Sequence, residues 1–276
     1  MASVLITGTS KGIGLATALA FGRAGYKVFA TMRNPSASSK LAETAAEEKL
    51  DIAISALDVD SDDSVRDGIG AILKHGPIDV LVNNAGVETV GSVEETPLAE
   101  FRSIMETNYF GVVRCVQAVA KQMRERQSGC IINVSSVAGR IAAPPFAAYC
   151  ASKWALEAMT EALAGEMKTF GVRVALVEPG IIDTAMAQRI SKAEKSSAYR
   201  QSERYASLFA GALQEQRPPT IISGKILEIA QNGTWTLRHI VGPGAAEIVA
   251  LHNGMTDEEA VSWNAADDET YFARFG

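Results

Sequence analysis

Short apolar runs alternate with longer amphipathic stretches along the whole chain. Runs typical of buried strands in length and residue type lie at 3–8, 27–32, 51–61, 78–86, 131–136, 171–177 and 237–242. The stretches between them favour helices, the clearest being 98–126, 149–168 and 218–233. Strands that alternate with helices require right-handed crossovers. The pattern therefore predicts an α/β fold, a doubly wound parallel sheet of about seven strands flanked by helices, as a single domain over 1–276.

A glycine cluster lies between the first predicted strand and the first predicted helix. Gly8, Gly12 and Gly14 occupy this turn. Glycines at such a junction let the backbone approach a pyrophosphate, and the amides at the start of the helix meet its negative charge. This strand, turn and helix order predicts a nucleotide-binding site.

The charge distribution indicates which nucleotide the site would bind. The chain has a net charge of −6, yet it has no Asp or Glu before Glu43 and has basic residues at 11, 23, 27, 33 and 40. An NAD enzyme carries a carboxylate for the ribose 2′-hydroxyl at the end of the second strand, where this chain has Arg33. Arg33, with Lys11 as a second cation, would bind a 2′-phosphate. We therefore expect NADP (NADPH) rather than NAD; the alternative is that both cations are solvated surface charges.

A hydroxyl, a phenol and an ammonium lie close together around the fifth strand. Ser136 ends that strand, where open α/β sheets place their sites, and Tyr149 and Lys153 are one turn apart on the following helix. An ammonium at this distance is expected to lower the pKa of the phenol from about 10, making it a usable acid or base. Tyr and Lys at this spacing also occur on solvated helix faces.

These motifs together resemble the short-chain dehydrogenase/reductase family. Ser136, Tyr149 and Lys153, with Asn108 upstream, are similar to its catalytic tetrad. Thr7 leads a turn that matches TGxxxGxG, residues 83–86 read NNAG, and residues 179–184 match P-G-x-x-x-T. The resemblance covers about residues 4–184 and implies a Rossmann-type fold.

The resemblance implies a role for each matched position. Asn83 would support the central sheet, Asn108 would kink its helix and hold a water, and Asp58 and Val59 would lie at the adenine edge, although Asp58 could equally cap the next helix. The residues expected to bind the cofactor are Gly8, Thr9, Ser10, Lys11, Gly12, Ile13, Gly14, Arg33, Asp58, Val59, Asn83, Ala85, Gly86, Tyr149, Lys153, Pro179, Gly180, Ile182 and Thr184.

The substrate site is expected beside these groups. The candidate substrate residues are Val87, Ser136, Ile141, Phe146, Tyr149 and Met186, and the apolar ones among them could equally be core. Residues 185–217 interrupt the strand rhythm and read either as a substrate lid or as an amphipathic surface helix pair. Residues 243–276 form a C-terminal extension.

The resemblance implies an NADP-dependent carbonyl reductase or alcohol dehydrogenase, acting on the CH–OH group of alcohols. Ser136 would bind the carbonyl oxygen, Tyr149 would protonate it, Lys153 would bind the ribose, and Asn108 would complete a proton relay. Bulky apolar substrates such as hydroxysteroids, retinoids or xenobiotic ketones are expected. The alternatives are a 3-oxoacyl-thioester reductase and, in another class, a catalytically silent NADP-binding sensor or scaffold.

Composition and the order of the predicted elements indicate where the protein is found and what it binds. The chain has 276 residues, of which 47% are hydrophobic, and no apolar run near 18 residues, so we expect no membrane insertion. The strand pattern starts at once and leaves no room for a signal peptide, which predicts a cytoplasmic protein. Three dispersed cysteines read as free thiols, and the histidines are too scattered for a metal site. Net negative charge argues against nucleic acid. By resemblance, we expect a homodimer or homotetramer.

Overall fold

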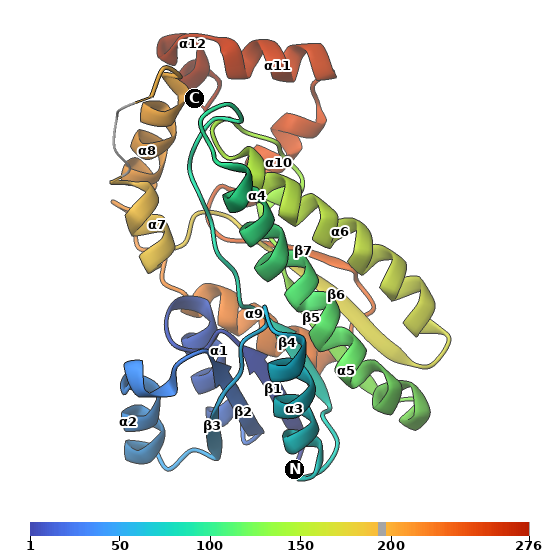
Figure 1. The fold of residues 1–276 in the computed structure, drawn as a ribbon. Coiled ribbons are helices and arrows are strands. Elements are labelled where there is room, and N and C mark those ends of the chain that lie inside the picture. The colour runs from blue at the N-terminus through green and yellow to red at the C-terminus, as the bar shows by residue number, and fades with distance from the viewer. Residues whose placement is uncertain (193–196, 276) are drawn as a thin grey trace.

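The central sheet has the predicted strand count and direction. A computed structural model describes residues 1–192 and 197–275. In these residues seven parallel strands form one sheet in the order β3-β2-β1-β4-β5-β6-β7 (Figure 1). The strands are β1 Ser3–Thr7, β2 Lys27–Met32, β3 Ile52–Ala56, β4 Val80–Asn83, β5 Gly129–Val134, β6 Val172–Pro179 and β7 Arg238–Val241. The predicted doubly wound, Rossmann-like sheet is confirmed.

Helices cover both faces of this sheet. They are α1 Gly12–Arg23, α2 Lys40–Glu47, α3 Asp62–Leu73, α4 Leu98–Met105, α5 Gly111–Arg126, α6 Ala147–Lys168, α7 Ala185–Ile190, α8 Gln201–Ala212, α9 Thr220–Asn232, α10 Ala245–Asn253, α11 Asp257–Ala265 and α12 Asp268–Phe272. Short turns lie at η1 Pro35–Ala37, η2 Glu106–Phe110, η3 Val137–Gly139 and η4 Ala273–Phe275. None of the helices in the described ranges is long and apolar enough to cross a bilayer.

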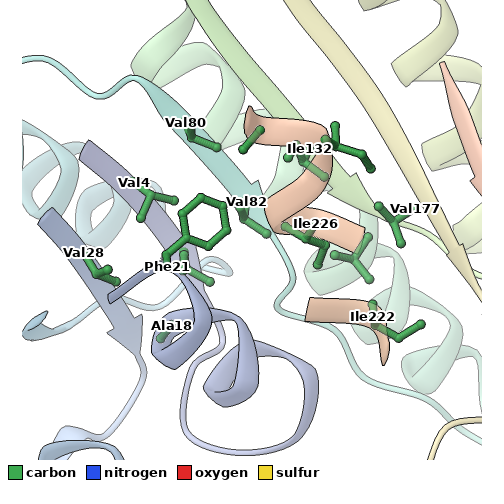
Figure 2. Packing of buried hydrophobic residues seen from close by; sticks show 14 of the residues in the cluster. Val4, Ala18, Phe21, Val28, Val80, Val82, Ile132, Val177, Ile222 and Ile226 are labelled. Carbon is green, nitrogen blue, oxygen red and sulfur yellow. The ribbon is translucent and has the colours of Figure 1, made fainter. Parts of the chain in front are cut away.

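The inner strands β1, β2, β4, β5 and β6 bury both faces because their side chains alternate between two cores, whereas the edge strands β3 and β7 are partly exposed. Val4 and Ile6 of β1 pack with α1 and α9, as Figure 2 shows around Phe21 and Ile226, whereas Leu5 packs on the other face with α3, α5 and α6. A strand that is buried on both sides is mostly apolar, which is why the inner strands appear as nearly continuous apolar runs.

Two helical regions differ in detail from the sequence prediction. The helix expected over 98–126 contains a π-helical turn at Glu106–Phe110, between α4 and α5. The expected lid at 185–217 contains the helices α7 and α8, and its residues 193–196 lie outside the described part of the chain.

The C-terminal extension packs against this lid region. Buried Arg204 of α8 donates to the Asp268 carboxylate at 2.7 Å and to the Asn264 carbonyl at 3.2 Å, and its guanidinium lies 4.4 Å from the Tyr271 ring centroid. Figure 1 shows α11 and α12 beside the end of α8. The extension therefore fixes the position of α8.

Candidate active site

The site lies where the chain switches direction across the sheet. From β1 the chain runs outward to β2 and β3, and it then returns to β4 on the other side of β1. At such a switch point the connections after two neighbouring strands diverge and leave a crevice. A cleft of about 550 Å³ opens there, lined by the segments that follow β1, β4, β5 and β6.

The glycine turn after β1 is built from backbone packed on backbone. Gly8 has φ +72°, and a Cβ on Gly14 would lie 2.2 Å from the Gly8 carbonyl oxygen. Asn84 clamps the turn, since its Nδ2 donates to the carbonyl oxygens of Thr7 at 2.9 Å and Gly8 at 3.1 Å. Of the predicted glycine-turn residues, all line the cleft except Thr9.

Thr9 and Asn83 are buried next to the cleft and do not line it. The Thr9 hydroxyl donates to the Thr31 carbonyl of β2 at 3.1 Å. Asn83 donates to Asn133 of β5 at 2.8 Å, and Asn133 donates to Thr160 of α6 at 2.9 Å. This geometry is consistent with the sheet-supporting role expected for Asn83. Both residues bind neighbouring strands of the sheet.

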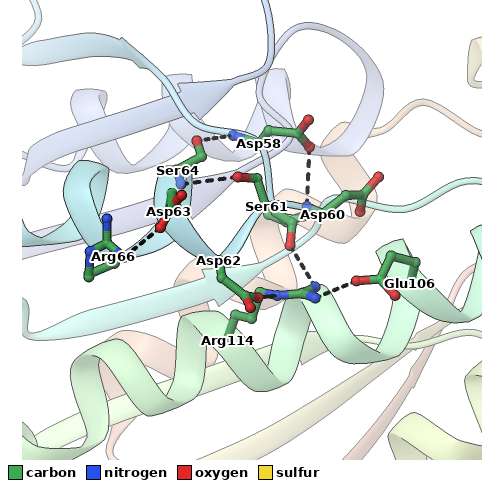
Figure 3. Close-up of polar contacts among 10 residues, drawn as sticks. Asp58, Asp60, Ser61, Asp62, Asp63, Ser64, Arg66, Glu106 and Arg114 are labelled. Carbon is green, nitrogen blue, oxygen red and sulfur yellow. Dashed lines mark hydrogen bonds and ion pairs between the residues drawn. The ribbon is translucent and has the colours of Figure 1, made fainter.

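The segments after β2 and β3 line the part of the cleft where the sequence predicts the adenine end of the cofactor. Arg33 and Lys11 are exposed and line the cleft, as do Asp58 and Val59. Figure 3 shows how the loop after β3 is fixed: the Asp58 amide donates to Ser64 Oγ at 2.9 Å, and the Asp58 carboxylate accepts from the Asp60 amide at 3.2 Å.

The alternative role of Asp58 as a helix cap is wrong. The cap of α3 is Ser61, whose hydroxyl accepts from the Ser64 amide at 3.2 Å. Arg114 of α5 holds the same loop by donating to the Val59 carbonyl at 3.1 Å. Asp58 is thereby free of helix capping, and it faces the cleft.

Ser136, Tyr149 and Lys153 converge in the middle of the cleft. The Ser136 hydroxyl accepts from the Ala138 amide at 3.1 Å and lies 3.5 Å from the Pro179 carbonyl. The Lys153 ammonium is 5.6 Å from the Tyr149 ring centroid and donates to the Val134 carbonyl at 2.9 Å. Three chemically distinct polar groups are thus presented on one wall.

Burial controls the ionisation of this group. Burial raises the pKa of Tyr149 well above its ordinary value, although the hydrogen bond with Ser136 acts in the opposite direction. Burial lowers the pKa of Lys153 to about 8, against the opposing effect of the Glu157 carboxylate. The expected lowering of the Tyr149 pKa is therefore wrong for this structure, because loss of solvation outweighs the favourable groups nearby.

Asn108 lies behind these residues, fully buried, in the π-helical turn η2. Its Nδ2 donates to the Val87 carbonyl at 2.9 Å and to Ser152 Oγ at 3.0 Å, and its Oδ1 accepts from the Val87 amide at 2.9 Å. The widened turn places a mid-helix Asn where it can bind the segment after β4. The helix irregularity matches the expected kink.

The far end of the cleft is apolar. Of the candidate substrate residues, Val87, Phe146 and Met186 line it with Ser136 and Tyr149, whereas Ile141 does not. Sequence reasoning did not assign Asn84, Ile190 and Phe209 to the site, yet all three line the cleft. Asn84 is the second residue of NNAG, a usable signal, whereas the two lid residues reach the cleft only through tertiary packing.

The segment after β6 closes the cleft beside the apolar end. Pro179, Gly180, Ile182 and Thr184 all line it. The Gly180 amide donates to the Val241 carbonyl of β7 at 2.9 Å, and the Thr184 hydroxyl accepts from the Ala187 amide at 3.3 Å to cap α7. In the described residues no three His, Cys, Asp or Glu side chains gather into a metal site.

A family model described as short chain dehydrogenase matches residues 2–195. The chain belongs to the short-chain dehydrogenase/reductase family. Bovine retinol dehydrogenase 8 is 42% identical over 201 residues, covering 70% of this chain and 64% of the relative. The 3-ketodihydrosphingosine reductase of Bacteroides thetaiotaomicron is 35% identical over 248 residues, 87% of each chain.

Solved short-chain dehydrogenase/reductase structures agree in fold along nearly the whole chain. A short-chain dehydrogenase from Streptomyces avermitilis has a TM-score of 0.80 at 32% identity, covering 96% of both chains. A variant of actinorhodin polyketide ketoreductase, crystallised with NADPH, has a TM-score of 0.80 at 27% identity, covering 88% of this chain and 97% of that one. The similarity in fold therefore extends well beyond the glycine turn.

Replacing Asn108 by Ala is expected to destabilise the protein. The change leaves the amide and carbonyl of Val87 without their side-chain partners, at about 1–3 kcal/mol for each buried unpaired group. Urea unfolding should show a free energy of unfolding lower by at least about 2 kcal/mol. Lys121→Ala, at an exposed position of α5, is the control and should stay within about 0.5 kcal/mol of wild type. An unchanged Asn108→Ala would contradict the structural role of this amide.

Proposed function

We propose that the protein is an NADP(H)-dependent oxidoreductase that interconverts a ketone or aldehyde and an alcohol on a bulky apolar substrate. The observation that carries this proposal is the convergence of Ser136, Tyr149 and Lys153 on one cleft with the glycine turn. A proton donor and a cation thereby lie beside a turn that can bind a dinucleotide and next to the apolar part of the cleft.

The cleft fits a nicotinamide dinucleotide. Backbone fills the space that a Cβ on Gly14 would take, so a pyrophosphate can approach main-chain amides closely. The Lys11 side chain does not cap α1, which leaves the amides of its first turn facing the cleft. Arg33 and Lys11 would bind the 2′-phosphate, and the NADPH-bound polyketide ketoreductase supports that choice. The reduced cofactor would supply hydride to the substrate carbonyl carbon.

The protein's own groups would manage the proton. Ser136 would donate a hydrogen bond to the carbonyl oxygen, and Tyr149, neutral because it is buried, would give that oxygen its proton. Lys153 would hold the ribose hydroxyls and stabilise the phenolate left behind. Asn108 would complete a proton relay, and its hydrogen bonds hold the segments of Val87 and Ser152 in place.

The apolar chamber supports a bulky substrate. Phe146, Met186, Ile190 and Phe209 belong to one buried cluster around Tyr149 and line the cleft. Such a lining offers dispersion contacts and few polar groups, which suits a polycyclic or long-chain ketone. Two relatives, retinol dehydrogenase 8 and 3-ketodihydrosphingosine reductase, support the same substrate class by their names.

Tyr149→Phe is expected to abolish turnover and leave cofactor binding intact. The change removes the proton donor and keeps the ring, so kcat should fall by about 10²–10⁴-fold with the Kd for NADPH nearly unchanged. NADPH oxidation is measured with polycyclic ketones, long-chain ketones and a 3-oxoacyl thioester. A Phe variant as active as wild type would exclude the phenol as the acid. Tight NADPH binding by the wild type with no turnover on any compound would favour a sensor.

Arg33→Ala is expected to weaken NADPH binding selectively. Loss of a charged hydrogen-bonding partner, at about 1.5–3 kcal/mol, predicts a Kd for NADPH higher by about ten- to a hundredfold and a nearly constant Kd for NADH. Fluorescence titration measures both. Arg66→Ala, which removes an exposed arginine of α3, is the control. Equal weakening of both nucleotides would contradict 2′-phosphate recognition.

We also infer a homo-oligomer that uses the outer surface of α5 and α6. Trp154 is 49% exposed there, beside a groove lined by Tyr109, Val113, Ala158 and Met159. Trp154→Glu should shift the mass measured by light scattering toward the monomer, because a charge would enter a desolvated contact. Trp235→Glu, at another exposed tryptophan, is the control. A Trp154→Glu protein with the wild-type mass would exclude this surface.

A further inference from the structure

A buried charge cluster lies directly behind the catalytic residues. It consists of Arg140, in the loop after η3, Glu157 of α6, Glu178 of β6 and Arg238 of β7. Glu178 is 0% exposed and Glu157 is 5% exposed. Carboxylates this deeply buried are costly unless charge and hydrogen bonds compensate them.

Arg238 contacts both carboxyl groups, and Arg140 contacts that of Glu178. Arg238 Nε lies 2.9 Å from Glu157 Oε2 and 3.5 Å from Glu178 Oε1. Arg140 Nη1 lies 3.5 Å from the same Oε1 of Glu178. Arg238 also reaches outward to Glu161 of α6, at 2.6 Å from its Nη2. The charged groups that face Glu178 are therefore Glu157, Arg140 and Arg238, one from each packed element.

Two oxygens of this cluster lack a partner. Oε1 of Glu157 and Oε2 of Glu178 are buried and accept no hydrogen bond. Two ionised carboxylates can only accept hydrogen bonds, whereas a protonated carboxyl group also has an O–H donor. Burial, followed by the neighbouring Glu157 charge, raises the pKa of Glu178 to about 7, while Arg140 and Arg238 act in the opposite direction.

The cluster touches the elements that carry the catalytic groups. Glu157 follows Lys153 by one helical turn. A Cβ on Gly139 would lie 2.9 Å from Glu157 Cγ and 3.2 Å from the Lys153 carbonyl, so the turn after Ser136 packs directly on α6. Glu178 immediately precedes Pro179, whose carbonyl is 3.5 Å from Ser136 Oγ.

We propose that Glu157 and Glu178 are positioning residues that hold Ser136 and Lys153 in register, with one proton retained on Glu178. The pair ties β6, α6 and the turn after Ser136 to one set of charges. The catalytic consequence rests on the proposed function, whereas the retained proton does not depend on it.

The first test measures thermal unfolding as a function of pH, and it needs neither cofactor nor substrate. The folded-state pKa of Glu178 is about 7 against an ordinary 4.5, so over that window the folded chain keeps a proton that the unfolded chain has released. Wild-type stability should fall as pH rises through the window. The Glu178→Gln variant cannot ionise, so its Tm relative to wild type should rise between about pH 5 and pH 8.

Glu161→Gln is the matched control for this test. Glu161 lies on the same helix and contacts the same arginine, yet its side chain is 63% exposed. Its Tm should run parallel to wild type over the same pH range. A constant difference between Glu178→Gln and wild type from about pH 5 to pH 8 would overturn the retained proton.

The second test separates positioning from binding. Glu178→Ala should lower kcat by about tenfold at an unchanged KM for NADPH, and Glu178→Gln, which keeps the shape and one acceptor, should restore most of it. Glu161→Ala should behave as wild type. Equal kcat for Glu178→Ala and wild type would overturn the positioning role.

The pH dependence decides the case if Glu178→Ala does not fold. A plot of wild-type kcat against pH should change slope near pH 7, and the plot for Glu178→Gln should not. The same change of slope in Glu178→Gln would overturn the proposal. A wild-type protein without turnover would refute the proposed function. The thermal unfolding test would then still show whether Glu178 retains its proton.

Discussion

The parallel pairing of β1 with β4 is the contact on which the site depends. It places the turn after Thr7 against the turn after Asn83, and the two are joined by hydrogen bonds in both directions. The Thr7 hydroxyl accepts from the amides of Asn84 and Ala85, and Asn84 returns two hydrogen bonds to the backbone of Thr7 and Gly8. These partly buried hydrogen bonds hold the backbone of both turns against each other beside the cleft.

Helix α6 adds chemistry to this floor through an unusual buried face. Tyr149, Lys153, Glu157 and Thr160 are all buried on it, each about one turn apart. A buried helix face is ordinarily apolar, and these groups persist because each has a partner on a neighbouring strand or turn. Thr160 accepts from Asn133 of β5, and Lys153 donates to Val134 at the end of the same strand. The sheet therefore orients the helix by polar contacts as well as by packing.

The sequence predicted those features that have local causes. Strands buried on both faces must be apolar, and a turn in which backbone meets backbone must be glycine, so both were visible in residues such as Val4, Ile6 and Gly14. The spacing of Tyr149 and Lys153 placed them on one face for the same reason. The parallel, doubly wound character of the sheet followed from the alternation of strands and helices together with the handedness of crossovers.

Features with non-local causes were not visible. The depth at which Tyr149 lies is set by the lid and by Phe146, so its desolvation could not be judged from neighbours in the chain, and the expected direction of its pKa was wrong. Thr9 and Asn83 point into the sheet, although neighbours in both motifs face the cleft. Phe209 reaches the cleft from a helix that is itself fixed by the C-terminal extension, through Arg204. No local pattern records such contacts.

Burial shifts the pKa values both of Lys153 in the candidate site and of Glu178 in the charge cluster. Burial lowers the pKa of Lys153 to about 8 and raises that of Glu178 to about 7, so both groups are brought toward neutrality from opposite directions. Glu157 connects them, since its negative charge supports the Lys153 ammonium and opposes ionisation of Glu178. Loss of solvation, with repulsion from Glu157, opposes a full negative charge on Glu178 and outweighs the attraction of Arg140 and Arg238. A proton retained on Glu178 avoids this repulsion, and the neighbouring Glu157 carboxylate favours the ammonium form of Lys153.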